Sequence, residues 1–284
     1  MSKGRSVYGV SMMRAMEAFV PKEQRLFADP FILELLPVIA RLGMRRPWLR
    51  RIFASMVDQK TPGVRGSILC RTRWINDAVQ DAFSRGIRTF LILGAGFDTR
   101  ANRLPALKRS QVLEVDLPDV QADKRRRLAR SGVNTSNVRF ISIDFDAVPL
   151  AETFAKNDLR KEEPQCLVWE GVTQYLSAKG VSAILSYAAS MPAGSEIIFT
   201  YVLEEAITRQ FSPGRNEEFR KTASYHPEPW HFGIDPDRLP SFLQEHHLIL
   251  AADVGADWYL ANYVCPRGRD LQVSEIERTA RAIL

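Results

Sequence analysis

Acidic residues stand at the ends of three short apolar stretches of the chain: Asp116, Asp144 and Glu170. A fourth apolar stretch, residues 89–93, runs into a turn that contains Gly94 and Gly96. Glycine has no Cβ, so a ligand can approach the backbone of such a turn closely. Asp116 lies 20 positions after Gly96, about where dinucleotide-binding folds place the acid that holds a ribose hydroxyl pair. The spacing therefore predicts a nucleoside site.

The glycine pattern alone has a simpler explanation. The third glycine of G-x-G-x-x-G is missing, because Thr99 occupies that position. A strand-to-helix turn with an acid nearby by chance would look the same. Three strand-end acids beside the turn favour a ligand crevice, because ligands bind at the carboxyl ends of strands in open α/β sheets.

The elements that must position these residues alternate between strand and helix. The predicted strands are buried, non-alternating apolar runs, which are typical of a parallel sheet with helices on both faces. They cover residues 89–93, 111–115, 139–143, 165–169 and 196–201. Two closing strands, 247–254 and 258–264, are separated by a short connector, which predicts an antiparallel hairpin. The tail, 274–284, is predicted to be one helix.

The segments outside this alternation are predicted to cover the sheet edge. Residues 1–86 show helical apolar spacing over 7–17, 31–42, 48–57 and 64–83. A long polar stretch after the fifth strand, at about 203–233, is typical of a lid or insertion. We therefore expect a helical lid over 1–86 and a catalytic domain over 87–284 that carries the insertion.

Composition indicates an ordinary globular protein. The 284 residues are 45% hydrophobic and 25% charged, with a net charge of +6. The basic residues are scattered among several helices, which favours solvated helix faces over a nucleic-acid interface. Three widely spaced cysteines favour a reducing compartment and show no metal-binding spacing. No apolar run approaches membrane-spanning length, so we expect a cytoplasmic protein without a membrane partner. From the charge distribution and the cysteine spacing we also expect neither a nucleic acid nor a metal as partner.

The sequence resembles the leucine carboxyl methyltransferase-like group of class I S-adenosylmethionine-dependent methyltransferases, in particular its bacterial O-methyltransferase branch. The matching motifs are Arg71-Thr72-Arg73, Leu93–Arg100, Glu114–Pro118, Asp144-Phe145, Glu170-Gly171 and Tyr175-Leu176. The resemblance implies a Rossmann-like α/β fold with a seven-stranded, mostly parallel sheet. It also implies the strand order 3-2-1-4-5-7-6 with an antiparallel terminal hairpin, and S-adenosyl-L-methionine as cofactor.

The resemblance also implies roles for the nucleoside end of the cofactor site. Gly94 and Gly96 would let the backbone meet the cofactor, and Asp116 would hold the ribose hydroxyls. Asp144 would accept from the adenine amino group, with Phe145 against the ring. Phe145 stands where the branch usually carries leucine, which alters the expected adenine wall.

The methionyl end is expected at Arg71 and Glu170. Arg71 would grip the cofactor carboxylate, for which a bidentate guanidinium is well shaped, although Arg73 could take that part instead. Glu170 would face the methionyl ammonium. Alternatively, Arg71 is a surface helix charge and Glu170 stabilises a helix N-terminus.

The resemblance implies O-methylation of a carboxylate or hydroxyl of a small molecule. A carboxylate is already anionic at neutral pH and needs no base, whereas a hydroxyl of high pKa needs one. No catalytic base is evident; the candidates are Tyr175, Tyr201, His226 and His231. Gly171 replaces the cysteine of leucine carboxyl methyltransferases proper, so methylation of a phosphatase tail is not implied.

Two other functions stay open at this point. One is an NAD(P)-dependent oxidoreductase, because Tyr175 and Lys179 fit Y-x-x-x-K, although that tyrosine follows a strand directly. The other is a non-catalytic S-adenosylmethionine-binding protein. Trp48, Ile52 and Phe53 could serve a partner surface, and core packing explains them equally well.

Overall fold

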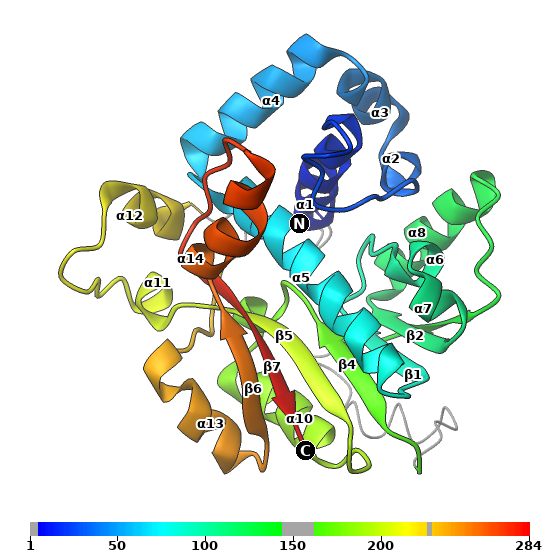
Figure 1. Cartoon of the computed structure of the whole chain (residues 1–284), viewed down its shortest axis with the longest axis vertical. Helices are drawn as coiled ribbons and strands as arrows, with labels where there is room; N and C mark the ends of the chain where they lie inside the picture. Colours follow the sequence, from blue (N-terminus) through cyan, green and yellow to red (C-terminus); the bar gives the residue numbers. More distant parts are fainter. Residues whose placement is uncertain (1–4, 144–161, 226–228) are drawn as a thin grey trace.

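A seven-stranded sheet forms the centre of the computed structural model, which describes residues 5–143, 162–225 and 229–284 (Figure 1). The strands are β1 (Thr89–Leu93), β2 (Gln111–Asp116), β3 (Val138–Ser142), β4 (Gln165–Trp169), β5 (Glu196–Val202), β6 (Ile249–Val254) and β7 (Glu277–Ile283). Their order is β3-β2-β1-β4-β5-β7-β6, with β7 antiparallel to both neighbours and the other pairs parallel. The predicted fold class and strand order are confirmed.

Strand register brings the predicted site residues to one sheet edge. Leu93 of β1 pairs with Val115 of β2 and with Trp169 of β4. The residues that follow these three positions, Gly94, Asp116 and Glu170, therefore lie side by side at the carboxyl edge of the sheet. Asp144 and Phe145 lie outside the described residues.

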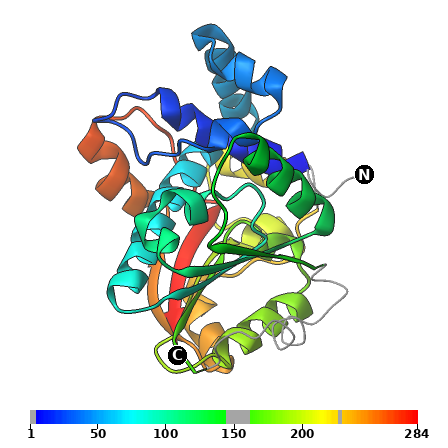
Figure 2. The ribbon, with the colours of Figure 1, turned by 90° about the vertical axis from the view of Figure 1, so that its right-hand side faces the viewer.

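Two hydrophobic cores cover the two faces of the sheet. Alternate residues of the strands pack either with α5 (Val64–Ser84) or with α10 (Ala178–Ala189) and α13 (Leu239–Glu245). Figure 2 shows the cyan α5 and the yellow-green α10 on opposite sides of the strands. Because β1, β4 and β5 are buried throughout, the sheet is a rigid support for the loops at its carboxyl edge.

Shorter helices surround this frame. They are α1 (Arg5–Met16), α2 (Ile32–Leu35), α3 (Val38–Met44), α4 (Pro47–Lys60), α6 (Arg100–Arg103), α7 (Pro105–Lys108), α8 (Pro118–Arg130), α11 (Glu204–Thr208), α12 (Glu217–Ser224) and α14 (Ala256–Tyr259). The single helix predicted over 31–42 is wrong, because the chain is extended at Leu36 and Pro37 between α2 and α3. Proline disfavours helical backbone at the residue before it and lacks an N–H to donate.

The C-terminal prediction is wrong in two places. The strand predicted over 258–264 is helical, as α14 followed by a π-helical turn, Leu260–Val264. Tyr259 and Tyr263 stack at 6.3 Å, the i,i+4 spacing of one helix face. The tail predicted as a helix contains β7, which bonds to strands on both sides. Pairing on both edges outweighs the helical tendency of this tail, because strand preference depends mainly on tertiary context.

Candidate functional site

The glycine turn after β1 has the backbone shape that only glycine adopts readily. Gly94 has φ +60° and Gly96 has φ +43°, both left-handed. A Cβ on Gly94 would overlap the Cγ2 of Val172, which comes from the loop after β4. The turn and this loop therefore face each other directly across the end of the sheet.

Asp116 is fixed to the glycine turn by backbone hydrogen bonds. Its Oδ2 accepts from the N–H of Gly96 at 2.5 Å, and its Oδ1 accepts from the N–H of Leu117 at 2.6 Å. Burial raises the pKa of this carboxyl above its ordinary value, and the two N–H groups oppose the rise. A buried carboxylate beside a glycine turn can accept further hydrogen bonds from hydroxyl groups, as its predicted role requires.

Arg71 on α5 lies between two carboxylates. Its Nε donates to Glu170 at 2.9 Å, and its Nη1 contacts both oxygens of Glu277 on β7. Burial alone would lower the pKa of Arg71, but Glu277 and Glu170 outweigh this and raise it. The remaining Nη2 lies 3.0 Å from where a Cβ on Gly171 would stand, and it bonds to none of the described residues.

Arg73 lies apart from this site. Its guanidinium pairs with Asp77 one turn along α5 and donates to the carbonyl of Leu26. Of the two arginines left open by the sequence, the structure therefore places Arg71 next to Glu170.

Arg100 extends the pairing toward the glycine turn. Its Nη1 contacts Asp98 at 2.5 Å and Glu170 at 2.6 Å, and its Nε donates to Asn76. Burial would raise the pKa of Glu170, but Arg100 and Arg71 outweigh this and lower it. The pKa of Asp98 is likewise lowered, since Arg100 and more distant cations outweigh its burial.

These contacts form one alternating series of charges, which we call the buried charge chain: Glu277, Arg71, Glu170, Arg100 and Asp98. None of their side chains is more than 14% exposed. Glu277 has no role predicted from sequence, because the tail is predicted to be a helix. Arg100 closes the glycine motif and could have been recognised from that position.

Helix α1, in the N-terminal segment, is hydrogen-bonded to the residues that follow the glycine turn. Arg14 on α1 donates to the carbonyl of Phe97 at 3.3 Å and to Thr99 at 3.1 Å, and it pairs with Asp29 at 2.8 Å. All of these groups are buried. Residues before the sheet are therefore bonded directly to the segment that follows the glycine turn.

The candidate bases have different surroundings. Tyr201 is fully buried on β5 and donates to Asp253 at 3.0 Å; burial and Asp253 raise its pKa. Tyr175 is half-buried in the loop after β4, and His231 is exposed. The backbone N–H of His231 donates to the carbonyl of Gln174 at 2.7 Å, so the insertion contacts that loop. His226 lies outside the described residues.

Comparison with known proteins gives a family match over much of the chain. The model of the family described as "Leucine carboxyl methyltransferase" matches residues 8–189. A protein of Frankia alni named "Putative S-adenosyl-L-methionine-dependent methyltransferase" is 30% identical, covering 70% of this chain and 68% of its own. One of the same description from Mycolicibacterium smegmatis is 38% identical over 45% of this chain, and the match spans 42% of that relative's length.

A solved structure supports the fold. The crystal structure of a "putative methyltransferase" from Thermobifida fusca superimposes with a TM-score of 0.57 at 19% identity, covering 83% of this chain and 88% of that one.

Proposed function

The chain belongs to the leucine carboxyl methyltransferase family of S-adenosylmethionine-dependent methyltransferases, and we propose that it methylates an oxygen of a small molecule, either a carboxylate or a hydroxyl. The observation that carries the proposal is the arrangement of Arg71, Glu170 and Asp116 at the carboxyl edge of the sheet. The site residues below are part of this proposal.

The nucleoside end of the cofactor fits the turn and β2. Gly94 offers backbone without a side chain of its own, and Asp116 keeps carboxylate lone pairs for ribose hydroxyls after accepting from Gly96 and Leu117. A ligand that touches Gly94 must displace the methyl groups of Val172, so this loop is expected to move when the cofactor binds.

The methionyl end fits the buried charge chain. Nη2 of Arg71 lies beside Gly171 and can donate to a carboxylate, while Glu170 offers negative charge to an ammonium group. Glu277 bonds to Nη1 of Arg71, so the guanidinium is already oriented before a ligand binds. Both charged groups of an amino acid therefore find complementary partners within one cluster.

The preference for a carboxylate over an alcohol as acceptor follows from what the chain offers as a base. When bound, the cofactor supplies a methyl group on a sulfonium, and the protein has mainly to align the acceptor and exclude water. Tyr201 is a poor base, because its raised pKa and its bond to Asp253 keep it protonated. A carboxylate acceptor needs no base at neutral pH, which favours it over an alcohol.

The acceptor is expected beside the loop after β4. Gly171 donates from its N–H to Thr200 at 2.8 Å, and Thr173 donates to the Thr200 carbonyl at 2.6 Å, so β5 anchors this loop. We propose that residues 1–86 and the insertion at about 203–233 cover the acceptor here. The partly polar segment 172–174 suits a polar acceptor.

The test is S-adenosylhomocysteine release across a panel of carboxylic acids, phenols and amines. An active acid should yield a methyl ester that releases methanol in mild alkali, whereas a phenol should yield a stable ether. An amine product would contradict O-methylation, and binding of the cofactor without release on any acceptor would indicate a non-catalytic protein. Asp116→Asn serves as the cofactor-site control.

The oxidoreductase alternative is disfavoured by topology. The classic dinucleotide-binding sheet has the order 3-2-1-4-5-6, whereas here the antiparallel β7 lies between β5 and β6. Lys179 is exposed on α10, so it is poorly placed to act with Tyr175. Titration with NADH should show no binding.

A further inference from the structure

The helical hairpin formed by α3 and α4 exposes six large apolar side chains. Both views show this hairpin at the end of the molecule opposite the C-terminus (Figures 1 and 2). Ile39 is 87% exposed and Trp48 is 60% exposed. We call the following set the α3–α4 surface: Val38, Ile39, Leu42, Trp48, Ile52 and Met56, all at least 46% exposed.

The exposed residues fall on coherent faces of the two helices. Trp48, Ile52 and Met56 follow one another at i,i+4 spacing on α4, so they share one side of that helix. Phe53, from the same helix, packs into the small N-terminal core instead. The apolar residues of α4 therefore form two groups. Phe53 packs against the core, whereas Trp48, Ile52 and Met56 are exposed to solvent.

The same hairpin carries almost all of the net charge of the protein. Residues 38–60 contain six basic side chains and one acidic side chain, a net charge of +5 out of +6 for the whole chain. Arg45, Arg46 and Arg51 are exposed and, in the part of the chain that the structure describes, contact no carboxylate. The rest of the protein is close to neutral.

We propose that the α3–α4 surface docks the enzyme onto an anionic lipid bilayer. An amphipathic element with tryptophan and large aliphatic residues beside exposed arginines has the composition of helices that lie in a membrane interface. The exposed arginines complement acidic headgroups. This replaces the expectation of no membrane partner, which rested on spanning length; a helix that lies on the surface does not need that length.

A second copy of the chain fits this surface less well. An isologous dimer places the same patch on both subunits, so the two clusters of arginines would face each other. The described residues of the hairpin include Asp58 as a counter-charge, and Asp58 is already paired with Arg65 of α5. Like-charge repulsion would therefore oppose self-association here.

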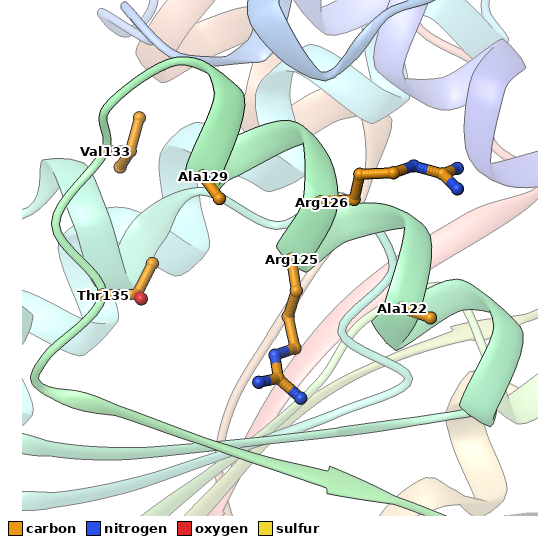
Figure 3. Close-up of a pocket in the computed structure, with 6 residues that line it drawn as sticks. All are labelled: Ala122, Arg125, Arg126, Ala129, Val133 and Thr135. Atoms are coloured by element: carbon orange, nitrogen blue, oxygen red, sulfur yellow. The ribbon is translucent and has the colours of Figure 1, made fainter.

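The other basic helix is a natural comparison. Arg125, Arg126 and Arg130 are exposed on α8, where a cavity of about 470 Å³ lies between the helix and the following loop (Figure 3). Its apolar lining is small, with Ala122, Ala129 and Val133. This helix also exposes three arginines, of which Arg126 pairs with Asp123, but it exposes no large apolar side chain.

The test is co-sedimentation with vesicles of phosphatidylcholine, with and without about one third phosphatidylglycerol. We expect binding to the acidic vesicles at least about tenfold tighter than to the neutral ones, and weaker binding at high salt. Two triple variants should each weaken binding about tenfold or more: Arg45→Gln/Arg46→Gln/Arg51→Gln, which removes charge, and Ile39→Ser/Trp48→Ser/Ile52→Ser, which removes apolar area. Both should bind S-adenosylhomocysteine as the wild type does, which shows that they fold.

The charge-matched control is Arg125→Gln/Arg126→Gln/Arg130→Gln on α8, which should bind acidic vesicles as the wild type does. An equal loss of vesicle binding in this control would overturn the proposal, because it would show that any exposed positive charge on the protein contributes equally. So would unchanged binding by the apolar variant, or no binding by the wild type. A wild-type dimer that the apolar variant converts to monomer would show that the surface serves self-association instead.

Discussion

Arginine is used in two opposite ways in the buried charge chain and on the α3–α4 hairpin. In the buried charge chain, the side chains of Arg71 and Arg100 are 8% and 1% exposed, and each contacts two carboxylates. On the α3–α4 hairpin, Arg45, Arg46 and Arg51 are exposed and contact no acid among the described residues. The first arrangement fixes the positions of the buried side chains, whereas the second creates a positive electrostatic potential at the protein surface.

The difference predicts how each region responds to change. Buried charges are little screened by salt, and removing one leaves its partners unpaired in a medium of low polarity. Exposed charges are solvated and screened, so each contributes little to stability. The same substitution should therefore have very different consequences in the two regions.

The largest effect is expected for Arg100→Gln. It leaves Asp98 without its side-chain partner and Glu170 with one guanidinium in place of two. Breaking a buried pair from one side costs about 3–5 kcal/mol. Urea unfolding should show that loss, and Arg51→Gln, the same substitution on the exposed hairpin, should stay within about 0.5 kcal/mol of wild type. Equal effects would remove the distinction between the two regions.

Arg71→Lys should act on the cofactor more than on the fold. Lysine keeps the charge but loses the planar fork that reaches Glu170, Glu277 and a ligand carboxylate together. A charge-assisted hydrogen bond is worth about 1.5–3 kcal/mol, so S-adenosylhomocysteine should bind about tenfold to a hundredfold more weakly by calorimetry.

Methylthioadenosine, which lacks the amino acid, separates the two ends of that site. Its affinity should be unchanged in Arg71→Lys, because it makes no contact with the guanidinium. The matched control is Arg73→Lys, two residues along the same helix, which should bind both ligands normally. If Arg73→Lys weakened S-adenosylhomocysteine instead, the assignment of the methionyl carboxylate to Arg71 would be wrong.

The buried charge chain should also give the protein a pH dependence. The pKa values of Glu170 and Asp98 are lowered in the folded state, so they bind protons less readily there than in the unfolded chain. Their stabilisation is present above the ordinary carboxyl pKa of about 4 and is lost as the pH falls.

Glu170→Gln should therefore flatten the decline of unfolding free energy between about pH 5 and pH 3. Denaturant titrations at several pH values measure this slope. Glu23→Gln, which removes an exposed acid from the N-terminal segment, controls for net charge. A similar flattening in that control would assign the effect to the overall charge rather than to the chain.

The glycine turn and the strand-end acids of this site can be predicted from sequence for physical reasons. The uninterrupted apolar run of β1 and the two left-handed glycines leave few alternatives for the turn after it. The positions of Glu170 and Asp116 in the site can then be predicted, because both residues stand at the ends of predicted strands. Family resemblance supplied the strand order, which local patterns do not determine.

The parts that sequence did not predict depend on distant partners. Glu277 reaches Arg71 only because β7 inserts between β5 and β6, and eleven tail residues with helical character carry no sign of that pairing. Similarly, Trp48 and Phe53 look alike as apolar residues of one helix. Only the packing of α4 shows that Phe53 belongs to a core and Trp48 does not.

The smallest effect is expected for Arg45→Gln/Arg46→Gln/Arg51→Gln. Arg46 and Arg50 are one turn apart and repel each other, so removing charge here should raise the unfolding free energy slightly, by up to about 0.5 kcal/mol. The wild type should gain a similar amount when salt screens these charges, and the variant should not. Thermal unfolding at low and high salt measures both. A large loss of stability in the variant would mean that these arginines have structural partners, and that the two regions differ less than their contacts indicate.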